Sequence, residues 1–316
     1  MKLGIIMDPI SKIDIKKDSS FAMLLAAQKR DWNIFYMTLD DLYMDNSKPK
    51  ARMRKLQVND DPKKWYVLSE DYHDCLSALD VILMRKDPPF NLEYIYSTYI
   101  LEYAQRLGVL VVNDPTALRN ANEKFFITYF PECIPPTRIS RDVNMLLDFV
   151  KEQNGCIIKP LDGMGGNGIY HLTELDDKVE EKLILITKNG SEYMMAQKFI
   201  PEITAGDKRI LLIDGEPVPY ALARIPKESN SKGNLAQGAT GKGIELSKRD
   251  KWICKNVGPT LKNMGLIFVG LDVIGDYLTE INVTSPTCIR DLDKIFDIDI
   301  GSQLMNVIEK HKKGNM

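Results

Sequence analysis

Short hydrophobic runs and polar interruptions alternate through the first third of the chain. Four apolar runs are typical of buried strands: residues 3–7, 33–37, 80–84 and 109–112. Asp18, Ser19 and Ser20 can cap an apolar helix that continues to about Gln28, and residues 93–106 predict a second helix. Strands separated by helices favour an α/β fold with a parallel sheet. Residues 46–74 are polar and mixed, and their pattern predicts no organisation.

The pattern changes after Asn113-Asp114-Pro115. We expect a helix containing Asn122-Glu123-Lys124, followed by breakers at Pro131 and Pro135-Pro136. Strands are predicted at residues 156–160 and 194–200, and two hairpins beyond Gly206 flank a polar, glycine-bearing stretch at 227–243. The resulting domain prediction is an N-terminal α/β domain at 1–121, a central domain at 122–200 and a C-terminal domain at 201–316.

Composition narrows the class of protein. A chain of 316 residues exceeds what one core usually organises, so two or three domains are expected. The net charge of −2 and the pI near 6.0 provide no basic field, so we expect no nucleic-acid partner. No apolar run approaches the ~20 residues that span a bilayer, and the N-terminal run is too short for a signal peptide.

Cysteine and histidine usage excludes some kinds of site. The five cysteines are widely spaced and form no CxxC pair, which favours reduced thiols in a cytoplasmic protein over a disulfide framework or a zinc site. His73, His171 and His311 are far apart in sequence, so we expect structural or surface roles rather than a metal site or a nucleophilic triad.

A glycine-rich loop, Asp162-Gly163-Met164-Gly165-Gly166-Asn167-Gly168, follows the strand that ends in Lys159-Pro160. Glycines let successive backbone N–H groups approach anionic oxygens. The loop matches neither GxGxxG nor the Walker A pattern, and it is typical of a lid over phosphates between two strands. The alternative is a plain surface loop, but Lys159 at the strand end could reach phosphates under such a lid.

The predicted hairpin at 266–282 has acidic and amide residues within two apolar strands. Glu280 and Asn282 are two residues apart, so they share a face of their strand. Asp272 faces Glu280 if the loop has three residues (275–277), whereas a two-residue loop turns it to the other face. Oxygen ligands on one face suit Mg²⁺. The alternative is a solvated outer face, although burying acids among Val, Ile and Leu is costly without a cation.

A second hairpin, at 208–224, turns at Asp214-Gly215. That register places Arg209 and Arg224 on the same face. Two arginines beside a phosphate site suit the neutralisation of charge during phosphoryl or acyl transfer. The alternative is that each arginine is a surface cation with a local partner.

Four segments together resemble the bacterial glutathione synthetase family of ATP-grasp ligases, and the likeness covers all but about the last ten residues. These segments are Met84-Arg85-Lys86-Asp87-Pro88-Pro89-Phe90, Lys159-Pro160-Leu161-Asp162-Gly163-Met164-Gly165-Gly166, Gly270-Leu271-Asp272 and Thr279-Glu280-Ile281-Asn282-Val283-Thr284-Ser285-Pro286-Thr287. The resemblance implies an ATP-grasp architecture: an N-terminal substrate-side domain, a central lid domain and a C-terminal domain, with ATP between the last two.

The resemblance also implies roles for individual residues. Lys124, Lys159 and the loop residues Gly163, Met164, Gly165 and Gly166 would contact ATP phosphates. Gln197, Lys198 and Phe199 would bind adenine, and Asp207 would contact ribose. Asp272, Glu280 and Asn282 would hold two Mg²⁺, with Mn²⁺ as a substitute. Arg209 and Arg224 would act in catalysis, and Arg85, Arg290, Ser19 and Ser20 would bind substrate carboxylates.

The reaction implied by the resemblance joins γ-glutamylcysteine to glycine through an acyl phosphate, giving glutathione, ADP and phosphate. The resemblance also implies that the protein is a homotetramer. Residues 227–243 would cover the intermediate, with Lys232 and Thr240 where we expect arginines in relatives. Two alternatives remain: another ATP-grasp carboxylate–amine ligase, such as a D-alanine–D-alanine ligase, or a non-catalytic synapsin-like ATP-binding module.

Overall fold

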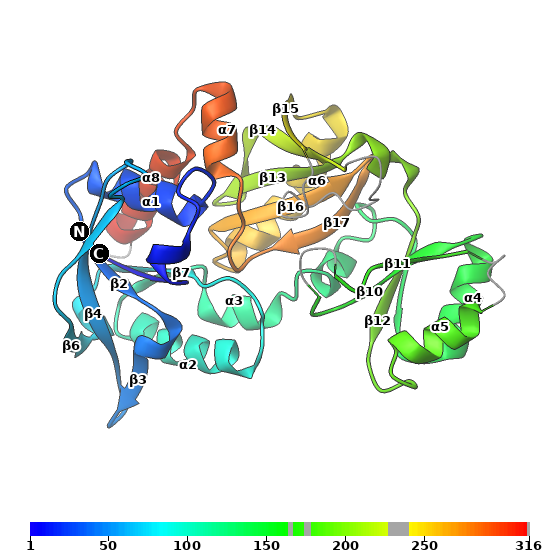
Figure 1. Cartoon of the computed structure of the whole chain (residues 1–316), viewed down its shortest axis with the longest axis horizontal. Helices are drawn as coiled ribbons and strands as arrows, with labels where there is room; N and C mark the ends of the chain where they lie inside the picture. Colours follow the sequence, from blue (N-terminus) through cyan, green and yellow to red (C-terminus); the bar gives the residue numbers. More distant parts are fainter. Residues whose placement is uncertain (164–166, 174–177, 227–239, 315–316) are drawn as a thin grey trace.

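The computed structural model describes residues 1–163, 167–173, 178–226 and 240–314, which form three β-sheets with helices around them (Figure 1). The first sheet has a parallel centre in the order β2-β1-β7-β8. Its strands are β1 (Lys2–Met7), β2 (Asn33–Met37), β7 (Val81–Arg85) and β8 (Leu110–Val112). The predicted α/β class and parallel sheet are therefore confirmed.

Two helices accompany this sheet, α1 (Ser19–Gln28) and α2 (Leu92–Arg106). Each begins at a side-chain cap, because Asp18 accepts a hydrogen bond from the Phe21 N–H at 2.6 Å and Asn91 accepts one from the Tyr94 N–H at 3.0 Å. The central strands are buried on both faces, which is the usual state of parallel strands between helices.

The segment with no predicted organisation, 46–74, contributes antiparallel strands to the same sheet. β3 (Leu42–Asp45), β5 (Tyr66–Leu68) and β6 (Tyr72–Cys75) all pair with the long strand β4 (Lys48–Val58). β4 itself joins β2. Its buried positions begin with Pro49, Ala51 and Met53, which alternate with lysine and arginine. The alternation was present in the sequence, but its apolar members are too small or too weakly β-forming to stand out.

The helix predicted to contain Asn122-Glu123-Lys124 is wrong. α3 (Pro115–Asn120) ends before these residues, and the 3₁₀ helix η4 (Phe125–Tyr129) begins after them. The Asn122 side chain accepts hydrogen bonds from the backbone N–H groups of Lys124 and Phe125, at 3.1 and 2.8 Å. This local turn competes with the helix and places Lys124 in a connection between two elements.

The second sheet is antiparallel, in the order β11-β10-β12-β9. Its strands are β9 (Thr137–Ser140), β10 (Cys156–Pro160), β11 (Tyr170–Leu172) and β12 (Met194–Lys198). α4 (Val143–Glu152) and α5 (Val179–Ile186) cover its outer face, at the right of Figure 1, and share a separate small core with it. The two strands predicted in this region are present.

The third sheet, in the order β15-β14-β13-β16-β17, contains both predicted hairpins. Its strands are β13 (Asp207–Ile213), β14 (Glu216–Ile225), β15 (Thr240–Glu245), β16 (Phe268–Ile274) and β17 (Tyr277–Asn282), and α6 (Lys248–Asn263) packs against it. The predicted cover at 227–243 needs correction, because Thr240, Gly241 and Gly243 belong to edge strand β15, which pairs with β14. Residues 227–239, including Lys232, lie outside the described residues.

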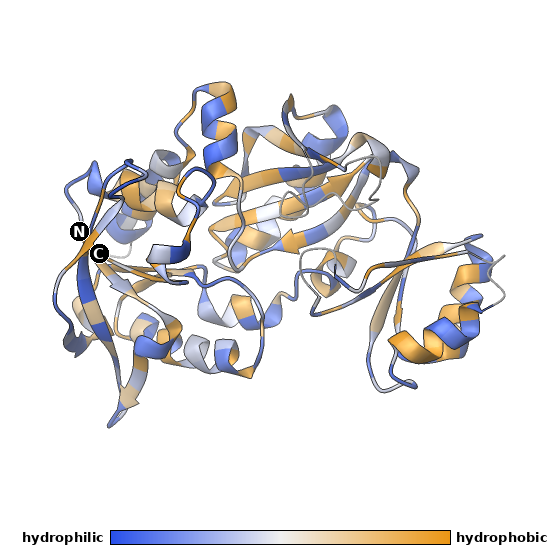
Figure 2. Ribbon diagram, viewed as in Figure 1, coloured by the Kyte–Doolittle hydropathy of each residue, from blue (hydrophilic) through white to orange (hydrophobic). Residues whose placement is uncertain are grey.

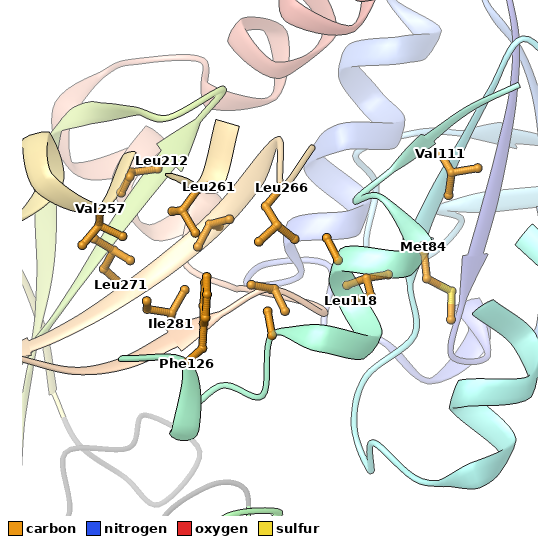
Figure 3. Packing of buried hydrophobic residues seen from close by; sticks show 14 of the residues in the cluster. Met84, Val111, Leu118, Phe126, Leu212, Val257, Leu261, Leu266, Leu271 and Ile281 are labelled. Carbon is orange, nitrogen blue, oxygen red and sulfur yellow. The ribbon is translucent and has the colours of Figure 1, made fainter. Parts of the chain in front are cut away.

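Hydrophobic packing joins the first and third sheets. Figure 3 shows buried side chains that run from Met84 and Val111, past Leu118 of α3, to Leu271 and Ile281 of the third sheet. Figure 2 shows that apolar residues are frequent along the strands of all three sheets. No helix in the described part of the chain has the length and apolar character needed to cross a membrane.

The C-terminal helices return to the N-terminal sheet. α7 (Ile289–Phe296) and α8 (Ile300–Gly314) pack beside α1, and Figure 1 shows α1 and α8 side by side. A Cβ added at Gly301 would lie 2.9 Å from the Ala22 carbonyl oxygen, so the close approach of α8 to α1 requires glycine there.

Candidate functional site

A cavity of about 660 Å³ lies between the second and third sheets and reaches the N-terminal sheet. One end is apolar, and the middle and far end are charged. The apolar end is lined by Ile157, Phe199, Ile200, Ile203 and Ile274. The middle is lined by Lys124, Lys159, Asp207, Arg209, Arg224, Asp272, Glu280 and Asn282. Most of the residues singled out from the sequence therefore meet in one place.

The acidic hairpin brings Asp272 opposite Glu280, as the sequence required. The predicted three-residue loop is wrong, because Ile274 pairs with Tyr277 across a two-residue turn. A β-bulge corrects the register: Val273 pairs with Leu278 and Asp272 with Glu280, which leaves Thr279 as the extra residue. The Thr279 hydroxyl donates to the Asp272 carbonyl at 3.1 Å. The bulge therefore places Asp272 opposite Glu280, which the three-residue loop was expected to do.

Arg209 and Arg224 both contact Asp272. Arg209 pairs directly with Asp272 across β13 and β16, and its Nε donates to Oδ1 at 2.5 Å. An Arg224 guanidinium nitrogen lies 2.9 Å from Oδ2. Burial alone would raise the pKa of Asp272, but the two arginines hold it well below its usual range. The predicted common face of the arginines is present, and an aspartate lies between them.

Asp207 lies beside this pair. Arg224 donates a hydrogen bond to Asp207 Oδ2. Burial raises the pKa of Asp207 to about 7, although Arg224 opposes the shift. Asp207 Oδ1 and Arg224 Nε are buried without a hydrogen-bond partner among the described residues. Each such atom costs on the order of 1–3 kcal/mol, so the pattern indicates a site completed by a ligand.

The two lysines approach the hairpin from different elements. Lys159, in β10, donates to the Thr279 carbonyl at 3.2 Å, and burial lowers its pKa although Glu280 opposes the shift. Lys124 donates to Glu123 Oε1 at 2.5 Å and to the Gly163 carbonyl. Burial lowers the pKa of Lys124, but Glu280, 3.7 Å away, and Glu123 raise it above its ordinary value.

Glu123 is a cavity residue that the sequence reasoning missed. Burial and the nearby Glu280 carboxylate raise its pKa. Its backbone also anchors the hairpin, because its carbonyl accepts the Ile281 N–H at 2.8 Å. The only sequence signal was its position next to Lys124. Together Glu123 and Glu280 balance the charge of the two lysines, so the centre carries both signs.

The apolar end contains the residues predicted to bind adenine. Gln197 is buried and donates to the Thr137 hydroxyl at 3.0 Å. The Phe199 ring stacks on His171, with centroids 4.3 Å apart and planes 20° apart. His171 also lines the cavity and was missed, because a single histidine carries no such signal. Gly163 borders the cavity, whereas Met164, Gly165 and Gly166 lie outside the described residues.

The residues predicted for substrate carboxylates are not among those lining the cavity. Arg85 is buried behind it and donates to Ser20 Oγ at 3.0 Å and to the Pro286 carbonyl at 2.8 Å. Ser19 Oγ accepts the Ile289 N–H. One guanidinium nitrogen of Arg290 donates to both carboxylate oxygens of Asp60, at 3.0 and 2.9 Å. This end is lined instead by Asp14, Lys17, Asp18, Asp87 and Asp291.

Comparisons with known proteins match almost the whole chain. Residues 1–119 match the model of the prokaryotic glutathione synthetase N-terminal domain, and residues 123–297 match that of its ATP-grasp domain. The glutathione synthetase of Pseudomonas aeruginosa is 56% identical over 98% of this chain and 97% of its own length. That of Coxiella burnetii is 53% identical, over 98% and 96%.

Solved structures with low sequence identity share the fold. D-cycloserine synthetase DcsG has a TM-score of 0.68 at 11% identity and covers 99% of this chain and 100% of its own. The ATP-grasp ligase PsnB, in a complex with precursor peptide PsnA2 and AMPPNP, has a TM-score of 0.64 at 15% identity and covers 99% and 98%. These likenesses confirm the predicted ATP-grasp architecture, and the chain belongs to the prokaryotic glutathione synthetase family of ATP-dependent ligases.

Proposed function

We propose that the cavity joins γ-glutamylcysteine to glycine, with Arg209 and Arg224 as its catalytic groups. The cysteinyl carboxylate attacks the γ-phosphorus of ATP, which forms an acyl phosphate and releases ADP. The glycine amine then attacks the acyl carbon, and phosphate leaves. The observation that carries this proposal is the meeting of Asp272, Glu280, Arg209 and Arg224 with two buried lysines in one cavity.

The nucleotide occupies the space between the second and third sheets. Lys124 and Lys159, with the backbone at Gly163, contact its phosphates, and Met164, Gly165 and Gly166, which were predicted to join them, lie outside the described residues. Gln197, Lys198 and Phe199 contact adenine at the apolar end. Asp207 accepts a hydrogen bond from a ribose hydroxyl, and its unpartnered Oδ1 supports that role. Binding would thus satisfy an atom that the protein alone leaves without a partner.

Two Mg²⁺ ions fit the donor set of Asp272, Glu280 and Asn282. These groups share one face of the hairpin, where the Asn282 amide nitrogen donates to Asp272 Oδ2 at 3.2 Å, and an ion would take the Asn282 amide oxygen instead. Within the described chain, no group of three or more histidine, cysteine, aspartate or glutamate residues is arranged as a metal site. Asp272, Glu280 and Asn282 would hold the ions together with phosphate oxygens, as Mg²⁺ usually requires, and Mn²⁺ suits the same oxygens. Bound there, the ions neutralise phosphate charge.

Arg209 and Arg224 supply the catalytic charge. Both are buried and fixed by Asp272, so they need little reorganisation when negative charge develops on the acyl phosphate and the tetrahedral intermediate. The protein has little covalent work to do, because phosphorylation turns a poor leaving oxygen into a good one. Water must be kept from the acyl phosphate. Residues 227–239, with Lys232, were predicted to cover it and lie outside the described residues.

The dipeptide lies at the charged end of the cavity. Lys17, Asp18, Asp87 and Asp291 line this end and suit an amino-acid headgroup of mixed charge. Arg85, Ser19 and Ser20 lie behind them and support the loop that carries Asp18. Arg290 is held by Asp60, so its proposed contribution to substrate binding is the least direct of the four. The family resemblance further supports a cytoplasmic homotetramer with no nucleic-acid partner.

Phosphate release tests the substrate assignment. Purified protein with Mg-ATP is offered γ-glutamylcysteine plus glycine in one tube and D-alanine alone in another. We expect phosphate in the first tube only, with glutathione confirmed by mass spectrometry. Phosphate in the D-alanine tube alone contradicts the assignment. Phosphate in neither tube, with ATP binding shown by equilibrium dialysis, indicates a binding module instead.

A metal titration tests the cation site separately. ATP binding to EDTA-treated protein is measured by calorimetry with increasing Mg²⁺, for the parent and for Glu280→Gln. We expect Mg²⁺ to strengthen ATP binding in the parent and to do so much less in the variant. An equal response in both proteins would remove Glu280 from the metal site.

A further inference from the structure

The side chain of Asn122 hydrogen-bonds two segments that are far apart in the sequence. Its oxygen accepts the backbone N–H groups of Lys124 and Phe125, which forms the turn between α3 and η4. Its nitrogen donates to the Leu161 carbonyl at 3.0 Å, directly after the end of β10. One amide therefore fixes both the turn that carries Lys124 and the chain that leads into Gly163.

The turn that carries Asn122 is firmly anchored. Leu118 of α3 and Phe126 of η4 lie on either side of it, and both belong to the buried cluster that joins the first and third sheets (Figure 3). The Glu123 carbonyl also accepts the Ile281 N–H of β17 at 2.8 Å. The turn is thus held by the core and by the third sheet, so Asn122 reaches the second sheet from a fixed point.

The second sheet is oriented in part by a small number of polar contacts. With α4 and α5 it has a hydrophobic cluster of its own, and Figure 1 shows it at the right margin of the molecule. In the described part of the chain, three side-chain hydrogen bonds join its segment 156–163 to residues outside the sheet. They are Asn122 to the Leu161 carbonyl, Lys124 to the Gly163 carbonyl and Lys159 to the Thr279 carbonyl. Because the cluster is separate, each of these bonds contributes to the orientation of the sheet.

Two of these three bonds use a lysine that we place on the nucleotide phosphates. When Lys124 and Lys159 turn to phosphate oxygens, the two backbone carbonyls that they hold in this structure lose their donors. Asn122 carries no charge and is not among the residues that line the cavity, so its bond to the second sheet is kept when the nucleotide binds. Of the three bonds, this one is compatible with both the free and the nucleotide-bound protein.

We propose that Asn122 is a positioning residue, which holds the second sheet in the orientation in which Lys124 and Lys159 reach the same phosphates. This inference rests on the ATP site proposed above. Asn122 touches no reactant and acts through the Leu161 carbonyl. Without this bond the sheet occupies the competent orientation for only part of the time, and the apparent Kd for the nucleotide rises by the inverse of that fraction. The loss of one hydrogen bond corresponds to a rise of about five- to tenfold.

Two substitutions separate the bond to Leu161 from the turn itself. Asn122→Ser keeps an oxygen that can accept the N–H groups of the turn, but the shorter side chain does not reach the Leu161 carbonyl, and it adds no charge. Asn122→Asp keeps the size and the accepting oxygen, and it replaces the donor with an oxygen that the Leu161 carbonyl repels. Asn144→Asp is the matched control, because Asn144 is exposed on α4, beside the same sheet.

Calorimetry of Mg-ATP binding is the first test, with urea unfolding to establish that each variant is folded. The Kd should rise about five- to tenfold in Asn122→Ser and at least as much in Asn122→Asp, and Asn144→Asp should match the parent. Adenosine, which has no phosphates, is measured by equilibrium dialysis. Its Kd should change by less than about twofold, because the apolar end of the cavity lies beside the connection between β12 and β13 and moves least. An unchanged Kd for Mg-ATP in Asn122→Ser, or an equal rise for adenosine, overturns the inference, whereas a parent that does not bind Mg-ATP contradicts the proposed function itself.

Steady-state kinetics of Asn122→Ser are the second test. The KM for Mg-ATP should rise in parallel with its Kd, whereas the KM for γ-glutamylcysteine should stay within about twofold of the parent, because no residue of the second sheet lines the charged end of the cavity. The kcat should fall by less than about threefold, since a saturating nucleotide restores the competent orientation. A purely structural role would lower kcat and raise both KM values together, and that result would overturn the positioning role.

Discussion

Among the described residues, two buried aspartates are each held by two arginines, and one of the two lies in the proposed catalytic cavity. Asp41 lies in the short 3₁₀ helix η2 (Leu39–Asp41) beside the N-terminal sheet, between Arg52 and Arg54. Asp272 lies in β16 between Arg209 and Arg224. Both carboxylates are buried and both have lowered pKa values. What separates them is whether the network around them is complete.

The network around Asp41 is complete. Its Oδ2 accepts the Thr38 N–H at 2.7 Å and the Thr38 hydroxyl at 3.0 Å, and its Oδ1 accepts the Arg52 Nε at 2.6 Å. Arg54 bridges both oxygens at 2.8 and 2.9 Å. Burial would raise the pKa of Asp41, but the hydrogen bonds from Thr38 and the two arginines outweigh burial and hold this pKa below its ordinary value. Such a cluster fixes the position of a turn.

The network around Asp272 is incomplete. Beside it, Asp207 Oδ1 and Arg224 Nε find no partner among the described residues, and Glu280 faces the open cavity. The same residue types thus serve structure where every polar atom is satisfied, and serve ligand binding where some are not. Four experiments test this contrast, from the largest expected effect to the smallest.

Glu280→Gln should reduce turnover by a factor of about 10²–10³, because it removes a carboxylate from the proposed metal site. The free energy of unfolding should change by less than about 1 kcal/mol, since Glu280 is only partly buried and lies near another carboxylate, Glu123. Phosphate release and urea unfolding measure the two effects. Turnover equal to that of the parent would remove Glu280 from the site.

Asp41→Ala should show the reverse pattern. Losing the carboxylate leaves Arg54 and the Thr38 N–H without their partner, which should cost about 3 kcal/mol of unfolding free energy. The kcat per folded molecule should stay within about twofold of the parent, since Asp41 does not line the cavity. Urea unfolding and active-site-normalised kinetics check this, and a large fall in kcat with normal stability would contradict it.

The two clusters should also respond to pH in opposite directions. The pKa of Asp41 is lowered on folding, so its stabilising contribution is present above about pH 4 and is lost as the pH falls through the folded pKa. The pKa of Asp207 is raised to about 7, so its favourable contribution exists below about pH 4 and is lost as the pH rises towards 7.

Urea unfolding of Asp41→Asn, Asp207→Asn and the parent in metal-free buffer measures this difference. The deficit of Asp41→Asn relative to the parent should shrink on acidification below about pH 4. The stability of Asp207→Asn relative to the parent should rise by up to about 4 kcal/mol between pH 4 and 7, at about 1.4 kcal/mol per pH unit. Parallel profiles for the two variants would contradict the comparison.

The smallest effect concerns the two arginines around Asp41. Arg52 is 43% exposed, so Arg52→Ala should cost about 0.5 kcal/mol. Arg54 is 15% exposed, bridges both oxygens and lies 5.4 Å from the Tyr36 ring centroid, so Arg54→Ala should cost about 1.5 kcal/mol. Urea unfolding compares them, and equal losses would mean that burial does not set the difference.

The sequence predicted which residues of the site face one another, but not every structural feature that brings them together. Glu280 and Asn282 share a face because strands have a period of two, and this holds in any register. The position of Asp272 depended on the turn, and the structure solves it with a bulge at Thr279. Nothing in the local pattern signals a bulge, because it is selected by pairing across strands.

Other features required long-range contacts. Lys124 was identified as a site residue, although the helix predicted around it is replaced by a turn that the Asn122 side chain stabilises. Glu123 enters the site because its carbonyl pairs with Ile281, far along the chain. The cavity wall near Asp18 and Asp291 combines segments from both ends of the sequence. Periodicity within a segment cannot report such meetings.

The close packing of α8 on α1 has a consequence for the order in which the protein can fold during synthesis. Leu304, Met305 and Ile308 of α8 share one hydrophobic cluster with Phe21 and Leu24 of α1. The first sheet is therefore one layer short until nearly the entire chain has left the ribosome. The N-terminal sheet and its covering C-terminal helix are therefore completed together. Early release of the nascent chain would leave an apolar face of the N-terminal part uncovered.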